Sequence, residues 1–172
     1  MQMSVWRQLR AIGPLPGVAT LVVPVLLLWA SDGPAVGFGL SAPLALLPVL
    51  AGAALVCQGL LLMHRTISLF ARSGEGTLAP WDPTRRLVVL GPYRHVRNPM
   101  ISGVMSILLG EGLLLGSPAI LGWFVVFVCL NAIFIPLFEE PDLVRRFGDD
   151  YLTYRRNVPR WVPRLRPWTP DV

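Results

Sequence analysis

Four long apolar segments restrict what this chain can fold into. They cover residues 15–30, 44–70, 99–115 and 118–138. Because a bilayer core of roughly 30 Å needs about 20 helical residues, each segment approaches or exceeds the length of a membrane-spanning helix. The sequence therefore predicts an all-α integral membrane protein, organised as a single membrane domain over residues 1–172. We expect about four transmembrane helices, with five as the alternative.

The composition supports this class and argues against two others. Of the 172 residues, 53% are hydrophobic, which is well above the share in soluble proteins. The net charge of +5 is compatible with nucleic-acid binding, but the arginines alternate with apolar blocks and form no aromatic-basic RNA motif. Cys57 and Cys129 lie inside apolar runs without the spacing of a metal site. We therefore expect no nucleic-acid partner, no metal and no disulfide.

The arginines predict how the helices are oriented. Arg7 and Arg10 precede the first apolar segment, a second group lies within residues 65–97, and a third lies within 145–166. The loop around Asp32 and the short turn before residue 118 contain no arginine and no lysine. Under the positive-inside rule, both chain termini and the arginine-rich loops face the cytoplasm.

The N-terminal segment shares features with a cleaved signal peptide, because Arg7 and Arg10 precede an apolar run. Pro14, Pro16 and Pro24 interrupt that run, and longer apolar segments follow it. We therefore expect the segment to remain as a helix.

A polar sequence, GPYRHVRNPMISG at residues 91–103, precedes the third apolar segment. Asn98 is a favoured N-cap and Pro99 a favoured first helical residue, so a helix is predicted to begin there. A helix start attracts anions through its unpaired N–H groups and its macrodipole, and Arg94 and Arg97 add positive charge. The alternative is that the two arginines only anchor the helix to lipid phosphates.

Two glutamates end the fourth apolar segment. The turn before residue 118 is so short that the third and fourth segments must form an antiparallel hairpin. Glu139 and Glu140 are therefore expected on the same side of the membrane as the polar sequence. A positive helix start facing two carboxylates suits a zwitterionic cofactor. The alternative is that Glu139 and Glu140 pair with neighbouring arginines.

Smaller patterns predict the surroundings of this hairpin. Ser102, Ser106 and Gly110 recur every four residues, and we expect this stripe to pack closely against the fourth segment. After residue 138, a short helix is expected to end at Gly148 and a second one to follow. The prolines beyond Asn157 forbid regular helix and predict an extended, arginine-rich strip at the lipid surface.

Two stretches together resemble a known enzyme family. LVVLGPYRHVRNPMISG and, one hairpin later, EEPDLVRRFGDDYLTYRRNVPRW are similar to the isoprenylcysteine carboxyl methyltransferase and phospholipid methyltransferase family of membrane enzymes. The resemblance covers residues 87–161. It implies methyl transfer from S-adenosylmethionine to a lipid-like substrate, with a cofactor pocket formed by the last hairpin and the segment after it.

The resemblance also implies which residues bind the cofactor and which substrate is disfavoured. The family's cofactor contacts fall on Leu87, Val88, Tyr93, Asn98, Pro99, Met100, Ile101, Glu139 and Glu140. Asn98 stands where the family commonly has histidine. Ile135 stands where members that methylate prenylcysteine have an arginine for the substrate carboxylate, so a prenylcysteine substrate is disfavoured. His95 and Glu140 are only positional candidates for a proton acceptor, and no catalytic residue is assigned.

The expected partners are therefore membrane lipids and a small lipophilic or amphipathic acceptor that enters from the bilayer. Two other functions remain open. One is an NADPH-dependent membrane reductase, because some sterol reductases resemble this family in the C-terminal hairpin. The other is a non-enzymatic membrane scaffold protein. The sequence does not predict the oligomeric state.

Overall fold

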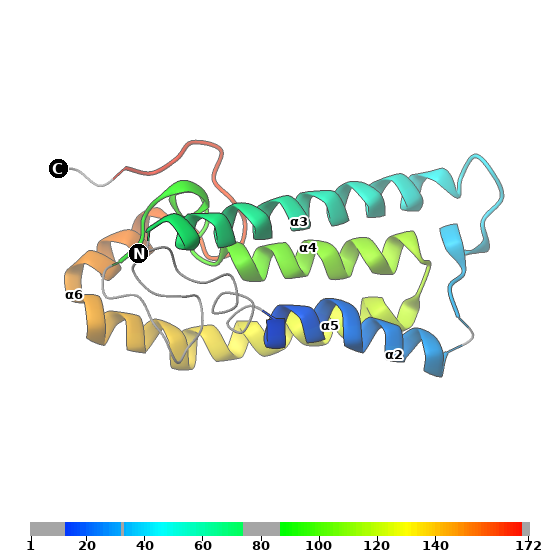
Figure 1. The fold of residues 1–172 in the computed structure, drawn as a ribbon, viewed down its shortest axis with the longest axis horizontal. Coiled ribbons are helices and arrows are strands. Elements are labelled where there is room, and N and C mark those ends of the chain that lie inside the picture. The colour runs from blue at the N-terminus through cyan, green and yellow to red at the C-terminus, as the bar shows by residue number, and fades with distance from the viewer. Residues whose placement is uncertain (1–12, 32, 74–86, 170–172) are drawn as a thin grey trace. The chain divides into compact units, whose positions relative to one another are not determined.

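A computed structural model describes residues 13–31, 33–73 and 87–169, and every regular element in these ranges is helical. The elements in chain order are η1 (Gly13–Val22), α2 (Val23–Ala30), η2 (Val36–Gly39), α3 (Leu46–Ser73), η3 (Gly91–Arg94), α4 (Pro99–Leu114), α5 (Pro118–Phe134), η4 (Ile135–Glu139) and α6 (Glu140–Asn157) (Figure 1). The prediction of an all-α protein is confirmed. Arg7, Arg10 and Asp32, on which the predicted orientation depends, lie outside the described residues.

Two helical stretches are long and apolar enough to cross a bilayer. They are Leu46–Leu69 within α3 and the continuous stretch Pro118–Asn157 that starts with α5. Only 11% of each apolar window is buried inside the protein, so most of these side chains face outward, where lipid can cover them. The other two apolar helices, Pro16–Ala30 and Pro99–Leu114, are shorter. The number of spans stays a prediction.

Proline widens the helical backbone in two places. Pro16 lies inside η1 and Pro136 inside η4, and both elements are π-helices. Proline has no N–H to donate to the carbonyl four residues earlier, so the local turn is altered. At η4 the helix continues from α5 into α6 without a break. The helix predicted after residue 138 is present as α6, which follows η4 directly.

The chain divides into two compact units, which we name by their chemistry. The polar unit contains the described residues of 62–102 and 131–169, and the apolar unit contains residues 13–61 and 103–130. The division falls within α3, α4 and α5, so each of these helices contributes to both units. All nine residues predicted to bind a cofactor belong to the polar unit.

In the apolar unit, α3 and α4 run antiparallel and touch through glycines (Figure 1). A Cβ atom at Gly52 would lie 2.6 Å from the Gly110 carbonyl oxygen, and one at Gly59 would lie 2.6 Å from the Gly103 carbonyl oxygen. Only glycine allows two backbones to come this close. The small-residue face of α4 therefore meets α3 at Gly110. The predicted packing of this stripe against the fourth segment is wrong at Gly110, because Gly110 contacts Gly52 and Val56 of α3.

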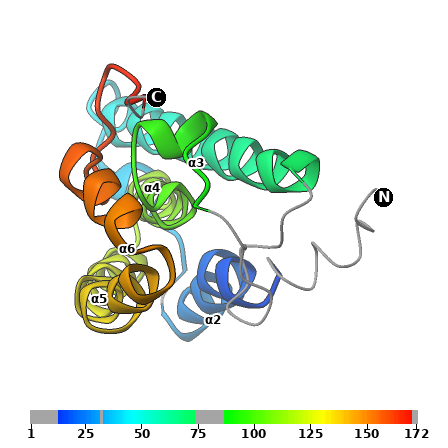
Figure 2. The same ribbon diagram turned by 90° about the vertical axis from the view of Figure 1, so that its left-hand side faces the viewer.

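Within the polar unit, α6 bends at Gly148. This glycine has φ +56° and ψ −132°, values that lie outside the helical region and that residues with a side chain rarely adopt. The two parts of α6 consequently point in different directions (Figure 2). The predicted helix end at Gly148 is confirmed as a sharp kink, after which the chain returns to helix up to Asn157.

Candidate functional site

The candidate site is built around the start of α4. The helix begins at Pro99, as predicted, and the Asn98 carbonyl accepts a hydrogen bond from the Ser102 N–H at 3.0 Å. Pro99 is fully buried and needs no partner for an N–H group that it lacks. Met100 and Ile101 follow in the first turn and are half-buried.

The segment after α6, residues 158–169, which we call the tail, binds this helix start. The Arg97 N–H donates to the Pro159 carbonyl at 2.8 Å, and the Asn98 N–H donates to the Arg160 carbonyl at 3.2 Å. The Ser102 hydroxyl donates to the Trp161 carbonyl at 3.1 Å. Two N–H groups just before the helix are thus occupied by neutral carbonyls, and an anion cannot use them without displacing the tail.

The same tail pairs further along with residues 91–98, which we call the polar loop. The Arg164 N–H donates to the His95 carbonyl at 3.0 Å, and His95 Nδ1 lies 2.8 Å from the Arg164 carbonyl, to which it donates because a carbonyl only accepts. The Trp168 N–H donates to the Arg94 carbonyl at 2.9 Å, and Arg94 Nε donates to the Trp168 carbonyl at 2.8 Å. The predicted lipid-facing strip is therefore held by its backbone against residues 94–98 (Figure 1).

Glu140 is a buried carboxylate surrounded by arginines. Its side chain is 2% exposed, and its Oε1 accepts from Arg97 Nη1 at 2.7 Å and from Arg160 at 2.9 Å. Arg155 Nε lies 3.5 Å from Oε2, and its side chain is 47% exposed. The alternative that the glutamates pair with neighbouring arginines is therefore correct for Glu140. This residue joins the start of α4, the start of α6 and the tail.

Glu139 has a different environment. It is half-buried and lies near Glu140 and Arg160. Tyr93 lies near it from the polar loop, and the Tyr93 carbonyl accepts a hydrogen bond from the Tyr154 hydroxyl at 2.7 Å. Burial raises the pKa of the Tyr93 phenol, and Tyr154 and Glu139 raise it further. Tyr93 therefore stays protonated at physiological pH.

The residues before the polar loop pack on an apolar cluster. Tyr151, Tyr154 and Val158 form its buried core, and Leu87 and Val89 pack against it. Val88, between them, is half-buried. The structure thus brings Leu87, Tyr93, the start of α4 and both glutamates into one unit. Arg160 and the tail carbonyls were missed by sequence analysis, because a proline-rich segment gives no periodic signal of what it contacts.

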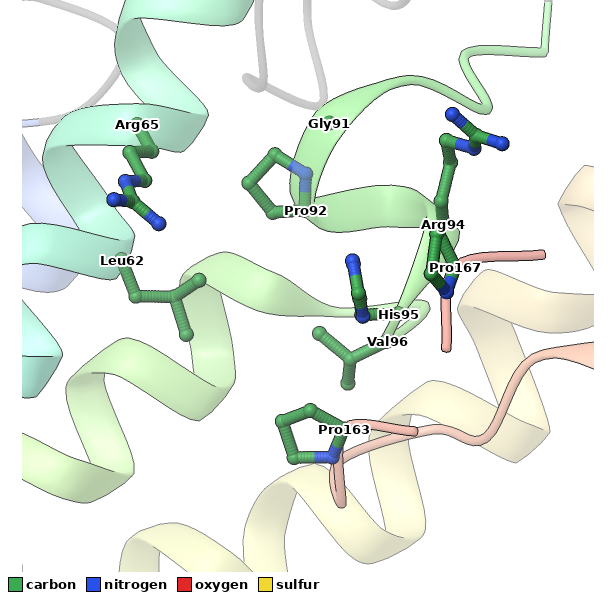
Figure 3. Close-up of a pocket in the computed structure, with 9 residues that line it drawn as sticks. All are labelled: Leu62, Arg65, Gly91, Pro92, Arg94, His95, Val96, Pro163 and Pro167. Carbon is green, nitrogen blue, oxygen red and sulfur yellow. The ribbon is translucent and has the colours of Figure 1, made fainter. Parts of the chain in front are cut away.

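A second feature of the polar unit is a pocket of about 520 Å³. It is lined by Leu62, Arg65, Gly91, Pro92, Arg94, His95, Val96, Pro163 and Pro167 (Figure 3). None of the nine residues predicted to bind a cofactor is among them. The polar loop contributes residues to both the glutamate site and the pocket. Tyr93 lies near Glu139, whereas its neighbours Pro92 and Arg94 line the pocket.

Comparison with known families decides where this chain belongs. The model of the phospholipid methyltransferase family matches residues 47–150, more than half of the chain and most of α3 to α6. The chain belongs to the phospholipid methyltransferase family. The resemblance seen in the sequence is thereby confirmed, and the match includes the helix start at Pro99 and both glutamates.

One curated relative is similar to part of this chain. Methanethiol S-methyltransferase 2 of Bradyrhizobium diazoefficiens is 36% identical to it over 76 residues. The alignment covers 42% of this chain and 27% of the relative, so the chain matches only about a quarter of that protein's length. No solved structure matches the chain.

Proposed function

We propose that the chain is a membrane enzyme that transfers a methyl group from S-adenosylmethionine to a small lipophilic or amphipathic acceptor entering from the bilayer. The observation that carries the proposal is the meeting of Tyr93, Glu139 and the Arg97–Glu140–Arg160 cluster at the start of α4. Membership of the family supports the reaction class.

The chemistry of the buried side chains fits this cofactor. Glu140 Oε2 and Arg97 Nε are buried, and neither has a hydrogen-bond partner among the described residues. Arg155 Nε forms an ion pair with Oε2 at 3.5 Å but does not meet hydrogen-bond geometry. A buried acceptor and a buried donor without hydrogen bonds are costly, and a ligand can supply those bonds. S-adenosylmethionine has ribose hydroxyls and an ammonium group for the first and a carboxylate for the second. When bound, it supplies a methyl group activated by an adjacent sulfonium.

The two glutamates have different parts in this proposal. Glu139 accepts hydrogen bonds from the ribose hydroxyls or the ammonium group, because no described residue forms an ion pair with it as close as those of Glu140. Glu140 positions Arg97 and Arg160 and presents only Oε2. Tyr93 donates from its neutral phenol. Methyl transfer needs alignment more than acid-base catalysis, so a rigid cluster of this kind is suited to it.

Two observations bear on the acceptor. Ile135 is 1% exposed, so the position where prenylcysteine enzymes place an arginine is here buried and apolar. A carboxylate next to it would be poorly stabilised. The relative's name makes a small thiol the first acceptor to test. A thiol sulfur would bond to the methyl carbon as the carbon–sulfonium bond breaks, and its proton would leave to solvent or to a base that we do not assign.

Calorimetry on the full chain in detergent tests the proposal against its alternatives. We expect S-adenosylhomocysteine to bind and NADPH not to bind. The Glu139→Gln variant should bind S-adenosylhomocysteine roughly tenfold more weakly, as for the loss of a charge-assisted hydrogen bond. Asp142→Asn is the matched control, because Asp142 is an exposed acid nearby in α6. Binding of NADPH alone would favour the reductase, and binding of neither would favour the scaffold. Unchanged affinity in Glu139→Gln would refute its assignment.

We also propose that the polar unit and both termini face the cytoplasm. The test uses a chain without Cys57 and Cys129, which are both exposed. A single cysteine is then introduced at Ser31, just after α2, or at Thr169 in the tail. An impermeant thiol reagent added to sealed cells should label the first and spare the second. Labelling of both from outside would contradict this orientation.

A further inference from the structure

The pocket beside the polar loop is chemically unlike the glutamate cluster. Three of its nine lining residues are basic, namely Arg65, Arg94 and His95, and none is acidic. The remaining walls are glycine, proline, leucine and valine. Arg65 and His95 approach from opposite sides, with Pro92 between them and Pro163 below (Figure 3). A cavity with positive charge on an apolar lining fits an anion that carries an apolar part.

The three basic side chains differ in how many of their hydrogen-bond donors are already used within the protein. Arg65 is exposed and has no ion pair or hydrogen bond with the described residues. His95 Nδ1 is held by the Arg164 carbonyl, which leaves Nε2 as the nitrogen that a ligand can reach. Arg94 is already bound to Trp168 and Thr169 of the tail, and its guanidinium points away from the pocket. Arg65 is therefore the side chain best placed to bind an anion in this pocket.

The place of Arg65 along α3 identifies the source of the anion. The apolar stretch of α3 runs over Leu46–Leu69, so Arg65 lies within its last two turns. An arginine at the end of a membrane helix reaches the level of the lipid headgroups. Leu62 lines the same pocket one turn deeper in the stretch. A phosphate at the level of the headgroups is expected to belong to a lipid. The apolar pocket wall formed by Leu62 would then face the acyl chains of that lipid.

We propose that this pocket binds the phosphate of an anionic membrane phospholipid, at a site separate from the methyl-transfer centre. The proposal goes beyond the proposed function, because the lipid bound here is a ligand and not a methyl acceptor. Phosphatidylglycerol is a suitable probe, since it has a phosphodiester and no amine to methylate. Neither the binding of S-adenosylhomocysteine nor methyl transfer is needed to detect it.

Native mass spectrometry of the full chain tests the proposal with three probes at equal concentration: phosphatidylglycerol, phosphatidylcholine and inorganic phosphate. We expect phosphatidylglycerol to be retained best. Arg65→Gln should weaken its binding about fivefold, as for one basic contact to an anionic lipid. Arg65→Lys should retain most of the affinity. Arg156→Gln, an exposed arginine of α6 outside the pocket, is the control and should change little.

Two results would overturn the proposal. Equal losses in Arg65→Gln and Arg156→Gln would mean that the lipid binds to diffuse charge and not to this pocket. Retention of inorganic phosphate equal to that of phosphatidylglycerol would mean that the ligand is a free anion and not a lipid. Both variants change exposed side chains, so we expect folding to be unchanged and binding to be the quantity compared.

Discussion

The two units of the molecule are stabilised by different interactions. In the polar unit, one carboxylate contacts three arginines, and the tail binds the polar loop through backbone hydrogen bonds. In the apolar unit, α3 and α4 approach through glycines, with backbone against backbone. The difference follows from the surroundings expected for each unit, which are water for the polar unit and lipid for the apolar unit. Lipid provides no hydrophobic force between helices, so close van der Waals packing must hold them.

This contrast explains why the polar unit can form a binding site. Ion pairs and tail contacts fix side chains that still have buried polar atoms without a hydrogen bond to the described residues, such as Arg97 Nε and Glu140 Oε2. The glycine contacts of the apolar unit leave no space at the helix interface, because a single added Cβ would clash. The contrast predicts that substitutions in the polar unit change stability by removing a charge, and that substitutions in the apolar unit change it by adding side-chain volume.

The largest effect is expected at Glu140. Glu140→Ala leaves Arg97, which is 10% exposed, without its carboxylate partner. Breaking a buried ion pair in this way costs about 3–5 kcal/mol. Arg155 adds little to this figure, because its side chain is half-exposed and screened by water. Titration with a denaturing detergent measures the loss, and hydrogen exchange should rise in residues 91–98 and 158–168.

Asp142→Asn is the matched control for this prediction. Asp142 belongs to the same helix and pairs with Arg145 and Arg146, but its side chain is 48% exposed. Exposed pairs of this kind contribute about 0–1 kcal/mol. Similar losses in Glu140→Ala and Asp142→Asn would remove the basis for treating the glutamate cluster as the centre of the polar unit.

A smaller effect is expected where α3 meets α4. At Gly59 the first atom of an added side chain would lie 2.6 Å from the Gly103 carbonyl oxygen and 2.6 Å from Ile107 Cγ1. Gly59→Val therefore forces the helices apart, at a cost of about 1–3 kcal/mol. Gly122→Val in α5 is the control, because nothing lies within 4 Å of a Cβ there. Thermal unfolding of the two variants measures the difference, and equal stability would show that the glycine contact is dispensable.

Helix positions were largely predictable, and their contacts were not. Asn98 followed by Pro99 marks a helix start through local chemistry, and Gly148 marks a break because it adopts a positive φ. These signals are local. The Gly52 and Gly59 contacts depend on a partner helix about 50 residues away, so only Gly110 was noticed and it was assigned the wrong neighbour.

The candidate site was predictable in part for the same reason. The sequence indicated that Glu139 and Glu140 lie near the polar loop, but it left open whether they bind a ligand or arginines. Both residues are glutamates at the end of an apolar segment, so the sequence does not tell which of them pairs with arginines. The positions of Arg97 and Arg160 in the structure show that it is Glu140. The tail binds mainly through backbone carbonyls, which every residue has, so no residue type could reveal it.

The smallest effect tests whether the tyrosine contact contributes beyond packing. Tyr154→Phe keeps the ring in the apolar cluster but removes the hydrogen bond to the Tyr93 carbonyl, which measures 2.7 Å. A part-buried bond of this kind is worth about 1 kcal/mol. Asn157→Ala removes an exposed bond to the Thr153 carbonyl from the same helix and should cost less. Thermal unfolding ranks the two. If Tyr154→Phe also weakens S-adenosylhomocysteine binding while Asn157→Ala does not, the hydroxyl positions Tyr93 for the cofactor, because the change leaves the apolar packing intact. Equal stability and equal binding in both variants would show that the polar loop is held by the tail and Glu140 alone.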